Sequence, residues 1–352
     1  MTKPGSSLRM LDCEVKGYKA CFTTGCFFKM TNVTMALCRI HNHRLGGILC
    51  EGRPGTKVNI MSSTITQNNI VGICLLGSNS HPKIKKNEIN ETNGPGIFCF
   101  IDTGPQIMEN SFNKNKSGVF VESADPLIFR NDILNSSESG VVFTTIEEAT
   151  CRGEMVMCTV KESEENGVLI KGLNCNPKIH SNLQIGLSKL AGIKVAEKAH
   201  PIISNNVIKN NLAQGILIVE GASAHISKNI IDENMKANIA FGGMLSGDTV
   251  IHHNTITNGR AEGIFMIEGE YAIITKNKIK KNMDGILLSA ASPLVSENKI
   301  EENRRCGIIM VSHCDPRVFR NLIVNNYMCG ILMRQNSMGA IEKNEVILIL
   351  ID

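Results

Sequence analysis

Two consecutive stretches of the sequence, 293–310 (PLVSENKIEENRRCGIIM) and 316–333 (PRVFRNLIVNNYMCGILM), follow one pattern. In each, a proline is followed by an asparagine five residues later, an isoleucine at seven, a second asparagine at ten and a Gly-Ile pair at fourteen. Two adjacent copies of one unit predict a repeat architecture, because self-similarity at a fixed period is the signature of solenoids and arrays.

The same unit recurs along most of the chain when it is aligned on the glycine of the Gly-Ile pair. Successive anchors are 22 to 27 residues apart. The anchors are Gly47, Gly72, Gly96, Gly118, Gly140, Gly167, Gly192, Gly215, Asn238 in place of glycine, Gly263, Gly285, Gly307 and Gly330. The leucine-rich repeat has a similar length, but its leucine and asparagine consensus is missing here.

Each unit contains short runs of alternating apolar residues separated by Asn, Gly, Pro and Ser, which are strand and turn signals. One unit is too short to bury a core alone, whereas stacked units pair every strand with its counterparts in the neighbouring units. Parallel crossovers are right-handed in nearly all proteins. We therefore predict an all-β fold, a right-handed parallel β-helix of about 13 coils with a period of 22–27 residues.

The composition fits such a fold and limits the classes of partner that we expect. Hydrophobic residues make up 42% of the chain but aromatic residues only 4%, so aliphatic side chains must build the core. The net charge of +4 is too small to predict a nucleic-acid partner. No apolar run is long enough for a membrane span or a secretory signal. We expect no membrane partner, a cytoplasmic location, and 13 cysteines that remain reduced.

The first asparagine of the unit recurs nine residues before the anchor. An amide both donates and accepts hydrogen bonds, so asparagines stacked at the strand spacing predict a ladder. The predicted ladder residues are Asn131, Asn206, Asn229, Asn254, Asn298 and Asn321. Asparagine also tolerates left-handed turns. A second set, which includes Asn211, Asn234, Asn303 and Asn326, is expected to serve the next turn.

The two ends depart from the pattern. Residues 1–34 fit it poorly and are predicted to form an irregular first coil or N-terminal cap, with the β-helix at 35–352. The last residues form an apolar strand without a polar cap, so we expect Ile347 and Ile349 to meet further polypeptide or a partner protein. Two lysine clusters are candidate contacts for an acidic surface, or a solvated strand face: Lys83, Lys85, Lys86 and Lys278, Lys280, Lys281.

Units such as 81–97 (HPKIKKNEINETNGPGI) and 200–216 (HPIISNNVIKNNLAQGI) resemble the pectate-lyase-like right-handed parallel β-helix repeat family. The resemblance covers roughly residues 35–346. This superfamily includes polysaccharide lyases, pectin hydrolases, uronate epimerases and non-enzymatic modules. The unit looks most like the β-helix F-box and Shc-binding proteins, and that likeness implies an intracellular recognition role.

Residues that carry chemistry are scattered. An enzyme of this fold needs converging acids, as a carboxylate pair or as calcium ligands beside a base. Six of the aspartates are isolated in the sequence: Asp102, Asp125, Asp232, Asp248, Asp284 and Asp315. The segment Ser312–Arg317 contains a histidine and an acid, but its Pro316 is the repeat proline. We predict no catalytic residue and no cofactor.

His41 and His43 alternate near Cys38 and Cys50, which leaves zinc binding or core filling as explanations. No Cys-x-x-Cys accompanies them, so we favour core filling and predict no metal site. Cys306 and Cys329 both precede an anchor glycine in adjacent coils. They are expected to lie within reach of each other as two thiols.

The sequence thus predicts a non-catalytic, rigid scaffold for protein–protein interactions, stacking on its C-terminal strand or binding through a lateral face. A cytoskeletal or ciliary assembly would suit it. The alternative is a carbohydrate-active enzyme: a polysaccharide lyase, hydrolase or uronate epimerase. With so few aromatic rings for stacking, we do not expect a carbohydrate partner.

Overall fold

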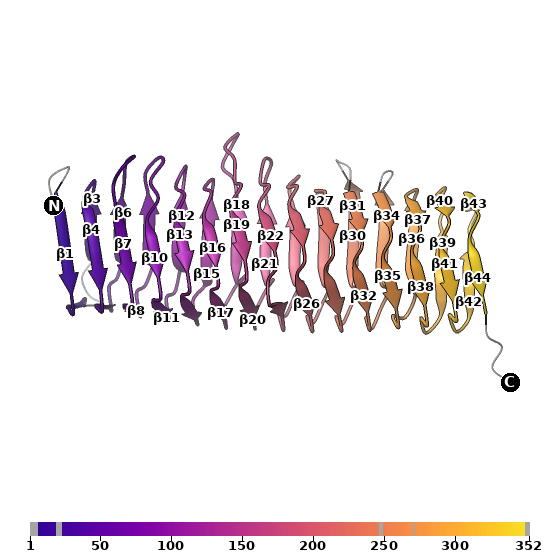
Figure 1. Ribbon diagram of the computed structural model, residues 1–352, viewed down its shortest axis with the longest axis horizontal. Helices are drawn as coiled ribbons and strands as arrows, with labels where there is room; N and C mark the ends of the chain where they lie inside the picture. Colours follow the sequence, from indigo (N-terminus) through magenta and orange to yellow (C-terminus); the bar gives the residue numbers. More distant parts are fainter. Residues whose placement is uncertain (1–5, 19–22, 246–248, 270–271, 349–352) are drawn as a thin grey trace. The chain divides into compact units, whose positions relative to one another are not determined.

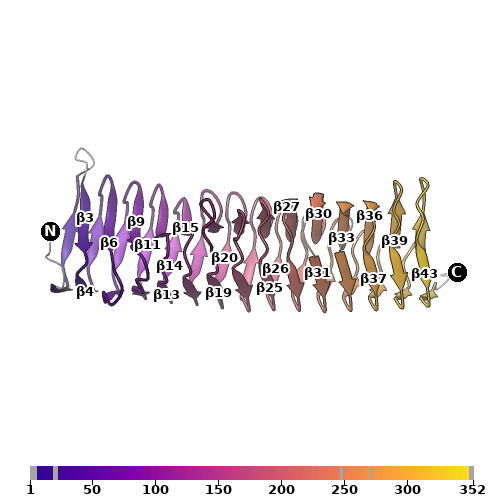
Figure 2. The ribbon, with the colours of Figure 1, turned by 90° about the horizontal axis from the view of Figure 1, so that it is seen from above.

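The computed structural model describes residues 6–18, 23–245, 249–269 and 272–348. Every regular element in these ranges is a β-strand. The described residues contain no helix long and apolar enough to cross a membrane. The chain divides into two compact units, Met1–Leu183 and Gln184–Asp352, called here the N-terminal and C-terminal units. Within each, three short strands per coil build three parallel sheets, A, B and C (Figures 1 and 2). The chain makes about 14 turns of right-handed parallel β-helix, which confirms the predicted fold.

In the N-terminal unit each sheet takes every third strand. Sheet A contains β1 (Ser7–Leu11), β4 (Asn32–Ala36), β7 (Val58–Met61), β10 (Lys83–Lys85), β13 (Gln106–Met108), β16 (Leu127–Phe129), β19 (Glu154–Val156) and β22 (Lys178–His180). Sheet B contains β2 (Glu14–Lys16), β5 (Arg39–His41), β8 (Thr64–Thr66), β11 (Glu88–Asn90), β14 (Ser111–Asn113), β17 (Asp132–Leu134) and β20 (Thr159–Lys161). Sheet C contains β3 (Thr24–Lys29), β6 (Gly46–Glu51), β9 (Val71–Leu76), β12 (Pro95–Phe100), β15 (Ser117–Glu122), β18 (Val141–Thr144) and β21 (Val168–Lys171).

The C-terminal unit repeats this arrangement. Sheet A contains β25 (Ile202–Ser204), β28 (His225–Ser227), β31 (Thr249–His252), β34 (Ala272–Thr275), β37 (Leu294–Ser296), β40 (Arg317–Phe319) and β43 (Ala340–Glu342). Sheet B contains β23 (Gln184–Gly186), β26 (Val207–Lys209), β29 (Ile230–Asp232), β32 (Thr255–Thr257), β35 (Lys278–Lys280), β38 (Lys299–Glu301), β41 (Leu322–Val324) and β44 (Glu345–Ile347). Sheet C contains β24 (Ile193–Ala196), β27 (Ile216–Gly221), β30 (Ile239–Leu245), β33 (Ile264–Gly269), β36 (Ile286–Ala291), β39 (Cys306–Val311) and β42 (Cys329–Met333).

The core consists mostly of aliphatic residues stacked coil upon coil. In sheet B of the C-terminal unit the central residue of every strand from β23 to β41 is a fully buried isoleucine: Ile185, Ile208, Ile231, Ile256, Ile279, Ile300 and Ile323. The last strand, β44, has the exposed Val346 at this position. Burying one such side chain contributes about 1.5–3 kcal/mol. The repeated isoleucine seven residues after the proline is therefore the core position of the unit.

The anchor glycine is required by the close approach of neighbouring coils. A Cβ added to Gly263 would lie 2.6 Å from the carbonyl oxygen of Gly285 and 2.6 Å from a methyl carbon of Ile279. Both atoms belong to the next coil, so a side chain would push the stack apart. This close approach explains why the Gly-Ile pair is the most regular feature of the sequence.

The predicted asparagine ladder is present. In the C-terminal unit each side-chain Nδ2 donates to the Oδ1 of the next asparagine at 2.9–3.0 Å. The ladder runs through Asn206, Asn229, Asn254, Asn277, Asn298, Asn321 and Asn344. In the N-terminal unit Asn87, Asn110 and Asn131 stack in the same way. Cys158 takes the next position there, and its Sγ lies 3.9 Å from Nδ2 of Asn131.

The left-handed backbone conformation falls on the residue before the ladder asparagine, not on the asparagine itself. Glu297, with a φ of 54°, precedes Asn298, and Arg320, with a φ of 53°, precedes Asn321. The turn role that the sequence suggested for the ladder asparagines is therefore wrong. Their amides are fixed by stacking, and the exposed neighbour makes the bend.

Asn238, which replaces an anchor glycine, completes a second ladder. Here Asn211 donates to Asn234 at 2.9 Å, but the next ladder position is Gly259, which has no amide side chain. The Asn238 side chain fills that place, because its Oδ1 accepts from Asn234 at 2.7 Å and its Nδ2 donates to Asn282 at 2.9 Å. Asn238 and Gly259 have thus exchanged their usual residue types.

Strands begin inside the segment assigned to an irregular first coil or cap. β1 pairs with β4 over five residues, and a Cβ added to Gly25 would lie 2.5 Å from the carbonyl oxygen of Gly47. Gly25 is therefore an anchor that the sequence pattern missed, and it adds one coil to the 13 counted from Gly47. Whether 1–34 acts as a cap stays a prediction.

At the other end, β43 and β44 are exposed along their length. Ile347 lies in β44 and is 41% exposed, while Ile349 lies outside the described residues.

The exchange between Asn238 and Gly259 generates a testable prediction. The single variants Asn238→Gly and Gly259→Asn should each lower the free energy of unfolding by about 1–3 kcal/mol, the first by leaving buried amides unpaired and the second by crowding Asn238. The double variant restores the usual residue at both positions, so its loss should be smaller than either single loss. Urea unfolding of all four proteins measures these effects, and strictly additive losses would contradict the account.

Candidate functional site

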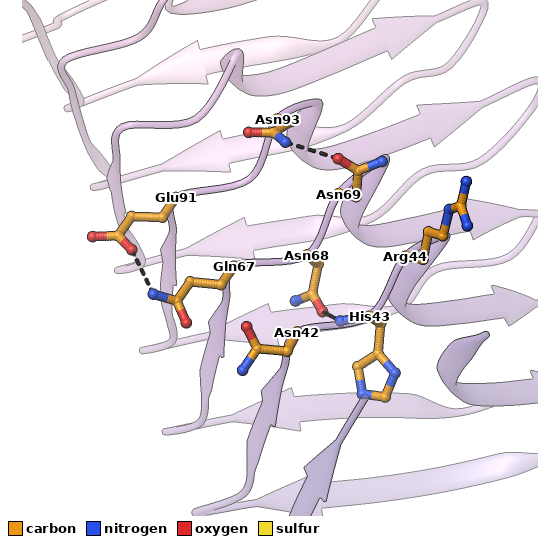
Figure 3. Close-up of a pocket in the computed structure, with 8 residues that line it drawn as sticks. All are labelled: Asn42, His43, Arg44, Gln67, Asn68, Asn69, Glu91 and Asn93. Carbon is orange, nitrogen blue, oxygen red and sulfur yellow. Dashed lines mark hydrogen bonds between the residues drawn. The ribbon is translucent and has the colours of Figure 1, made fainter. Parts of the chain in front are cut away.

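A polar hollow of about 650 Å³ opens on the side of the N-terminal unit, in the turns between sheets B and C (Figure 3). These turns join β5 to β6, β8 to β9 and β11 to β12. The lining residues are Asn42, His43, Arg44, Gln67, Asn68, Asn69, Glu91 and Asn93. Six of these eight carry an amide or a carboxylate, so the hollow is dominated by hydrogen-bonding groups.

Two rows of side chains cross the hollow along the stacking direction. Backbone hydrogen bonds from Asn42 to Thr66 and from Gln67 to Asn90 align the first row, which is Asn42, Gln67 and Glu91. Corresponding bonds from Asn69 to His43 and from Asn93 to Asn68 align the second row, which is Arg44, Asn69 and Asn93. Neighbouring members of a row are therefore one coil apart, about 4.8 Å.

Within each row, the side chains of the second and third coils form a hydrogen bond with each other. Gln67 Nε2 donates to Glu91 Oε2 at 3.0 Å, and Asn93 Nδ2 donates to Asn69 Oδ1 at 2.7 Å. All four of these side chains are exposed. Arg44 and Glu91 lie on opposite sides of the amides (Figure 3). A cation and a carboxylate thus flank a strip of groups that can both donate and accept.

The inner members of the site hold the turn. Asn68 is buried, and its Oδ1 accepts from the backbone N–H of His43 at 3.1 Å. His43 is 4% exposed, and its Nε2 lies 3.2 Å from the carbonyl oxygen of Val15. The buried Nδ1 of His43 has no hydrogen-bond partner among the described residues. His41 is also buried, with its Nε2 2.8 Å from Glu14 Oε1. Both histidines are thus buried, with His43 at the edge of the hollow and His41 beneath the exposed Glu14.

The hollow suits sugar binding and proton transfer better than hydrolysis. Glycoside hydrolysis uses a pair of carboxyl groups on the two sides of the scissile bond. Glu91 is the one carboxylate among the lining residues. An arginine, by contrast, binds a planar carboxylate through two parallel hydrogen bonds. Arg44 is therefore a suitable group for an acidic sugar.

A second hollow, of about 870 Å³, lies on the C-terminal unit between the corresponding sheets. Its lining residues are Leu187, Asn210, Leu212, Glu233, Met235, Asn258, Arg260 and Arg304. Leu212 and Met235 are exposed there, so this surface is more apolar than the hollow of the N-terminal unit. The N-terminal hollow is consequently the better site for a ligand rich in hydroxyl groups.

The lysines predicted as an interaction surface are largely engaged in ion pairs. Lys85 and Lys86 lie 3.4 and 3.7 Å from carboxylate oxygens of Glu109. Lys278 and Lys280 both approach Glu301, at 3.6 and 3.9 Å. Glu302 lies 3.2 Å from Lys280 and 3.8 Å from Lys281.

These ion pairs lower the pKa of Glu301, the acid that several lysines surround. Partial burial alone would raise the pKa of Glu301, but a hydrogen bond from Lys299 and the charges of three lysines outweigh burial and lower it. The second cluster is therefore charge-compensated. Lys83 is exposed on β10. Whether any of these residues or Ile347 contacts a partner stays a prediction.

Three histidines lie close together in the C-terminal unit. His225 Nε2 lies 2.8 Å from His252 Nε2, and His252 Nδ1 lies 2.8 Å from His253 Nδ1. Burial, followed by the charges of the two histidines, Lys228 and Lys276, lowers the pKa of His252. Both ring nitrogens of His252 are thus occupied by hydrogen bonds.

Comparison with known proteins places the chain among parallel β-helix proteins. The family model for a periplasmic copper-binding protein (NosD) matches residues 154–332, more than half of the chain. The model for a right-handed β-helix region matches residues 4–150. No curated protein matches the sequence.

Solved structures share the fold at low sequence identity. A point mutant of the periplasmic alginate epimerase AlgG has a TM-score of 0.64 and 10% identity, with 86% of this chain and 77% of that chain covered. The unmutated AlgG has a TM-score of 0.59 and 11% identity over the same shares. The A-module of the Azotobacter vinelandii mannuronan C-5 epimerase AlgE4 has a TM-score of 0.49 and 11% identity, with 96% of this chain and 89% of that chain covered.

These comparisons correct two predictions. The matching family is named for a periplasmic protein, which contradicts the cytoplasmic location. The predicted scaffold role in a cytoskeletal or ciliary assembly is also contradicted, because the findings, which include the epimerase AlgG among the solved structures that share the fold, fit the carbohydrate-active alternative better. At 10–11% identity these structures show a shared fold and not a shared activity, so they give the expectation of a non-enzyme no support. The resemblance to β-helix repeats is confirmed, but not the closer likeness to intracellular recognition modules.

The copper in the family's name finds no matching site in the part of the chain that the structure describes. Among the described residues there is no group of three or more His, Cys, Asp and Glu side chains that could hold a metal ion. The nitrogens of His225, His252 and His253 face one another in hydrogen bonds rather than converging on one point. What the described residues share with the family is therefore the repeat pattern and the fold. The chain belongs to the NosD family of right-handed parallel β-helix proteins.

Proposed function

We propose that the protein is a carbohydrate-active β-helix protein of the periplasm or the extracellular space that binds an acidic polysaccharide in the N-terminal hollow. The observation that carries this proposal is the strip of exposed amides flanked by Arg44 and Glu91. The match to a family named for a periplasmic protein supports the proposed location, and the alginate epimerase that shares the fold supports a carbohydrate ligand.

The two rows of side chains suit a linear polysaccharide. Their members repeat once per coil, about 4.8 Å, a step comparable to the length of one sugar residue. Sugar hydroxyls donate and accept hydrogen bonds, as amides do. A chain lying along the stacking direction would therefore meet a fresh amide at each sugar. The amides of Gln67 and Asn69 would bind one sugar, and Asn93 the next.

This mode of binding departs from the expectation that few aromatic residues exclude a carbohydrate partner. Aromatic stacking is one way to hold a sugar ring, and hydrogen bonding by side chains on a rigid surface is another. Here the backbone beneath the hollow is held by hydrogen bonds on both sides of each turn. Little backbone entropy is then lost when the side chains engage a ligand.

The charged groups suggest a reaction that begins with removal of a proton next to a carboxylate. Arg44 would pair with the carboxylate of one uronate residue of the bound chain. Glu91, two coils along the rows, would act as a general base on a different uronate residue of the same chain. Epimerisation and β-elimination both start with this step. Hydrolysis does not fit as well, because one carboxylate lines the hollow instead of a pair.

The role of Arg44 is tested by binding. Arg44→Ala should weaken the affinity for uronate oligosaccharides by about tenfold or more, since a hydrogen bond to a charged group contributes about 1.5–3 kcal/mol. Affinity for carboxyl-reduced oligosaccharides of the same length should change little. Arg53→Ala, an exposed arginine of the same unit outside the hollow, is the matched control. Isothermal titration calorimetry measures both, and equal losses for acidic and neutral ligands would rule out carboxylate recognition.

The role of Glu91 is tested by turnover. Glu91→Gln keeps the hydrogen bond with Gln67 but removes the base, so binding should stay within about threefold while proton exchange is lost. NMR in D₂O follows exchange of the hydrogen next to the carboxylate, and ultraviolet absorbance follows elimination. Glu88→Gln, an exposed carboxylate in the same coil, is the control. If Glu91→Gln turns over as fast as the parent protein, Glu91 is not the base.

A further inference from the structure

Two cysteines stand one above the other in neighbouring coils of the C-terminal unit. Cys306 begins β39 and Cys329 begins β42, and the two residues are direct partners in the parallel register. Their Sγ atoms are 2.8 Å apart. Cys306 is 1% exposed, whereas Cys329 is only half-buried. One thiol of the pair is therefore within reach of a small reagent.

The geometry suits a covalent bond between these sulfurs. Neighbouring parallel strands lie about 4.8 Å apart, inside the Cα separation of about 4.4–6.8 Å that disulfides accept. The S–S bond is about 2.05 Å long, so the two sulfurs need to approach by less than about 1 Å. A metal ion between two thiolates would instead require the sulfurs to be roughly 3.7 Å apart, given bonds of about 2.3 Å. The present contact is too short for that role.

We propose that Cys306 and Cys329 are an oxidation site that closes into a disulfide and cross-links two neighbouring coils. The inference rests on register and distance and is independent of the proposed carbohydrate function. It replaces the expectation of two permanent thiols, which followed from a cytoplasmic location that the comparisons contradict.

The reaction needs a small-molecule disulfide, such as oxidised glutathione, as the oxidant. The thiolate of Cys329 attacks one sulfur of glutathione disulfide, forms a mixed disulfide and releases one glutathione thiolate. Cys306 Sγ then loses its proton to water and attacks Sγ of Cys329, and the second glutathione leaves as thiolate. Two protein thiols are oxidised and one glutathione disulfide is reduced. Burial, together with the neighbouring Cys329, raises the pKa of Cys306 to about 12, so this thiol gives up its proton less readily than an ordinary cysteine.

A second cysteine pair provides an internal comparison. Cys151 and Cys175 are also partners in a parallel bridge, but both are fully buried. A hydrogen bond with Cys151, together with burial, raises the pKa of Cys175 far above the ordinary value. Stacking is thus common to both pairs, and access of the oxidant differs. We expect the Cys306–Cys329 pair to react much faster.

The test is oxidation of the intact protein with glutathione disulfide, followed by alkylation and mass spectrometry without reduction. The parent protein should lose two hydrogen masses and yield one cross-linked peptide that contains Cys306 and Cys329. Cys306→Ser should stop at the glutathione adduct of Cys329. Cys314→Ser, which removes a buried thiol from the same unit, should cross-link like the parent protein.

The cross-link should also raise the apparent melting temperature of the oxidised parent protein by several degrees, because it closes a loop of the unfolded chain. Dithiothreitol should reverse that shift. A stable glutathione adduct on Cys329 of the parent protein, or alkylation of both cysteines after oxidation, would overturn the proposal. Neither result depends on the folding of a variant.

Discussion

The stacking of coils in fixed register is the constraint on which the rest of the structure depends. Each residue inside a unit meets its equivalent in the next coil about 4.8 Å away, so a buried polar group must be able to pair with its own kind. The asparagine amide meets this condition because it carries a donor and an acceptor. Asn229, for example, accepts from Asn206 and donates to Asn254 at 3.0 Å each. Isoleucine packs against isoleucine in the next coil, and glycine lets the backbones of neighbouring coils approach closely.

The same register organises the outer surface. Asn68 faces inward and holds the turn, while Gln67 and Asn69, on either side of it, face outward in the two rows of the hollow. A side chain that changes in one coil therefore changes one step of a row and leaves the core intact. This separation explains how a structural repeat can carry a binding surface without a conspicuous motif. Cys306 and Cys329 use the register in another way, because it holds two equal side chains close enough to react.

Much of the fold could be predicted from the sequence, because the interior repeats one residue type per position. The spacing of Gly263, Gly285 and Gly307 and of the asparagines nine residues earlier was sufficient for the coils and the ladder. The anchor Gly25 was missed because the residues around it lack the asparagine and isoleucine of the unit. The exchange between Asn238 and Gly259 was missed because their side chains meet across coils and not within one repeat.

The candidate site was harder to predict for a related reason. Asn42, Gln67 and Glu91 are about one repeat apart in sequence and form a row only once the coils stack. Amides were interpreted as turn and ladder residues, and the outward ones have the same residue types as the inward ones. The lysines looked like a charged surface because their partners, such as Glu301 for Lys278, lie in the neighbouring coil. The predicted location and the predicted scaffold role are wrong for a further reason. A repeat pattern indicates how the side chains pack, and the same packing occurs in enzymes and in scaffolds.

The most direct test of the central claim is hydrogen–deuterium exchange of the whole chain with and without a uronate oligosaccharide of about six residues. The account predicts slower backbone exchange in peptides that cover 42–44, 67–69 and 91–93, with little change in the C-terminal unit. Protection confined to other turns, or no protection at ligand concentrations that saturate binding, would contradict it.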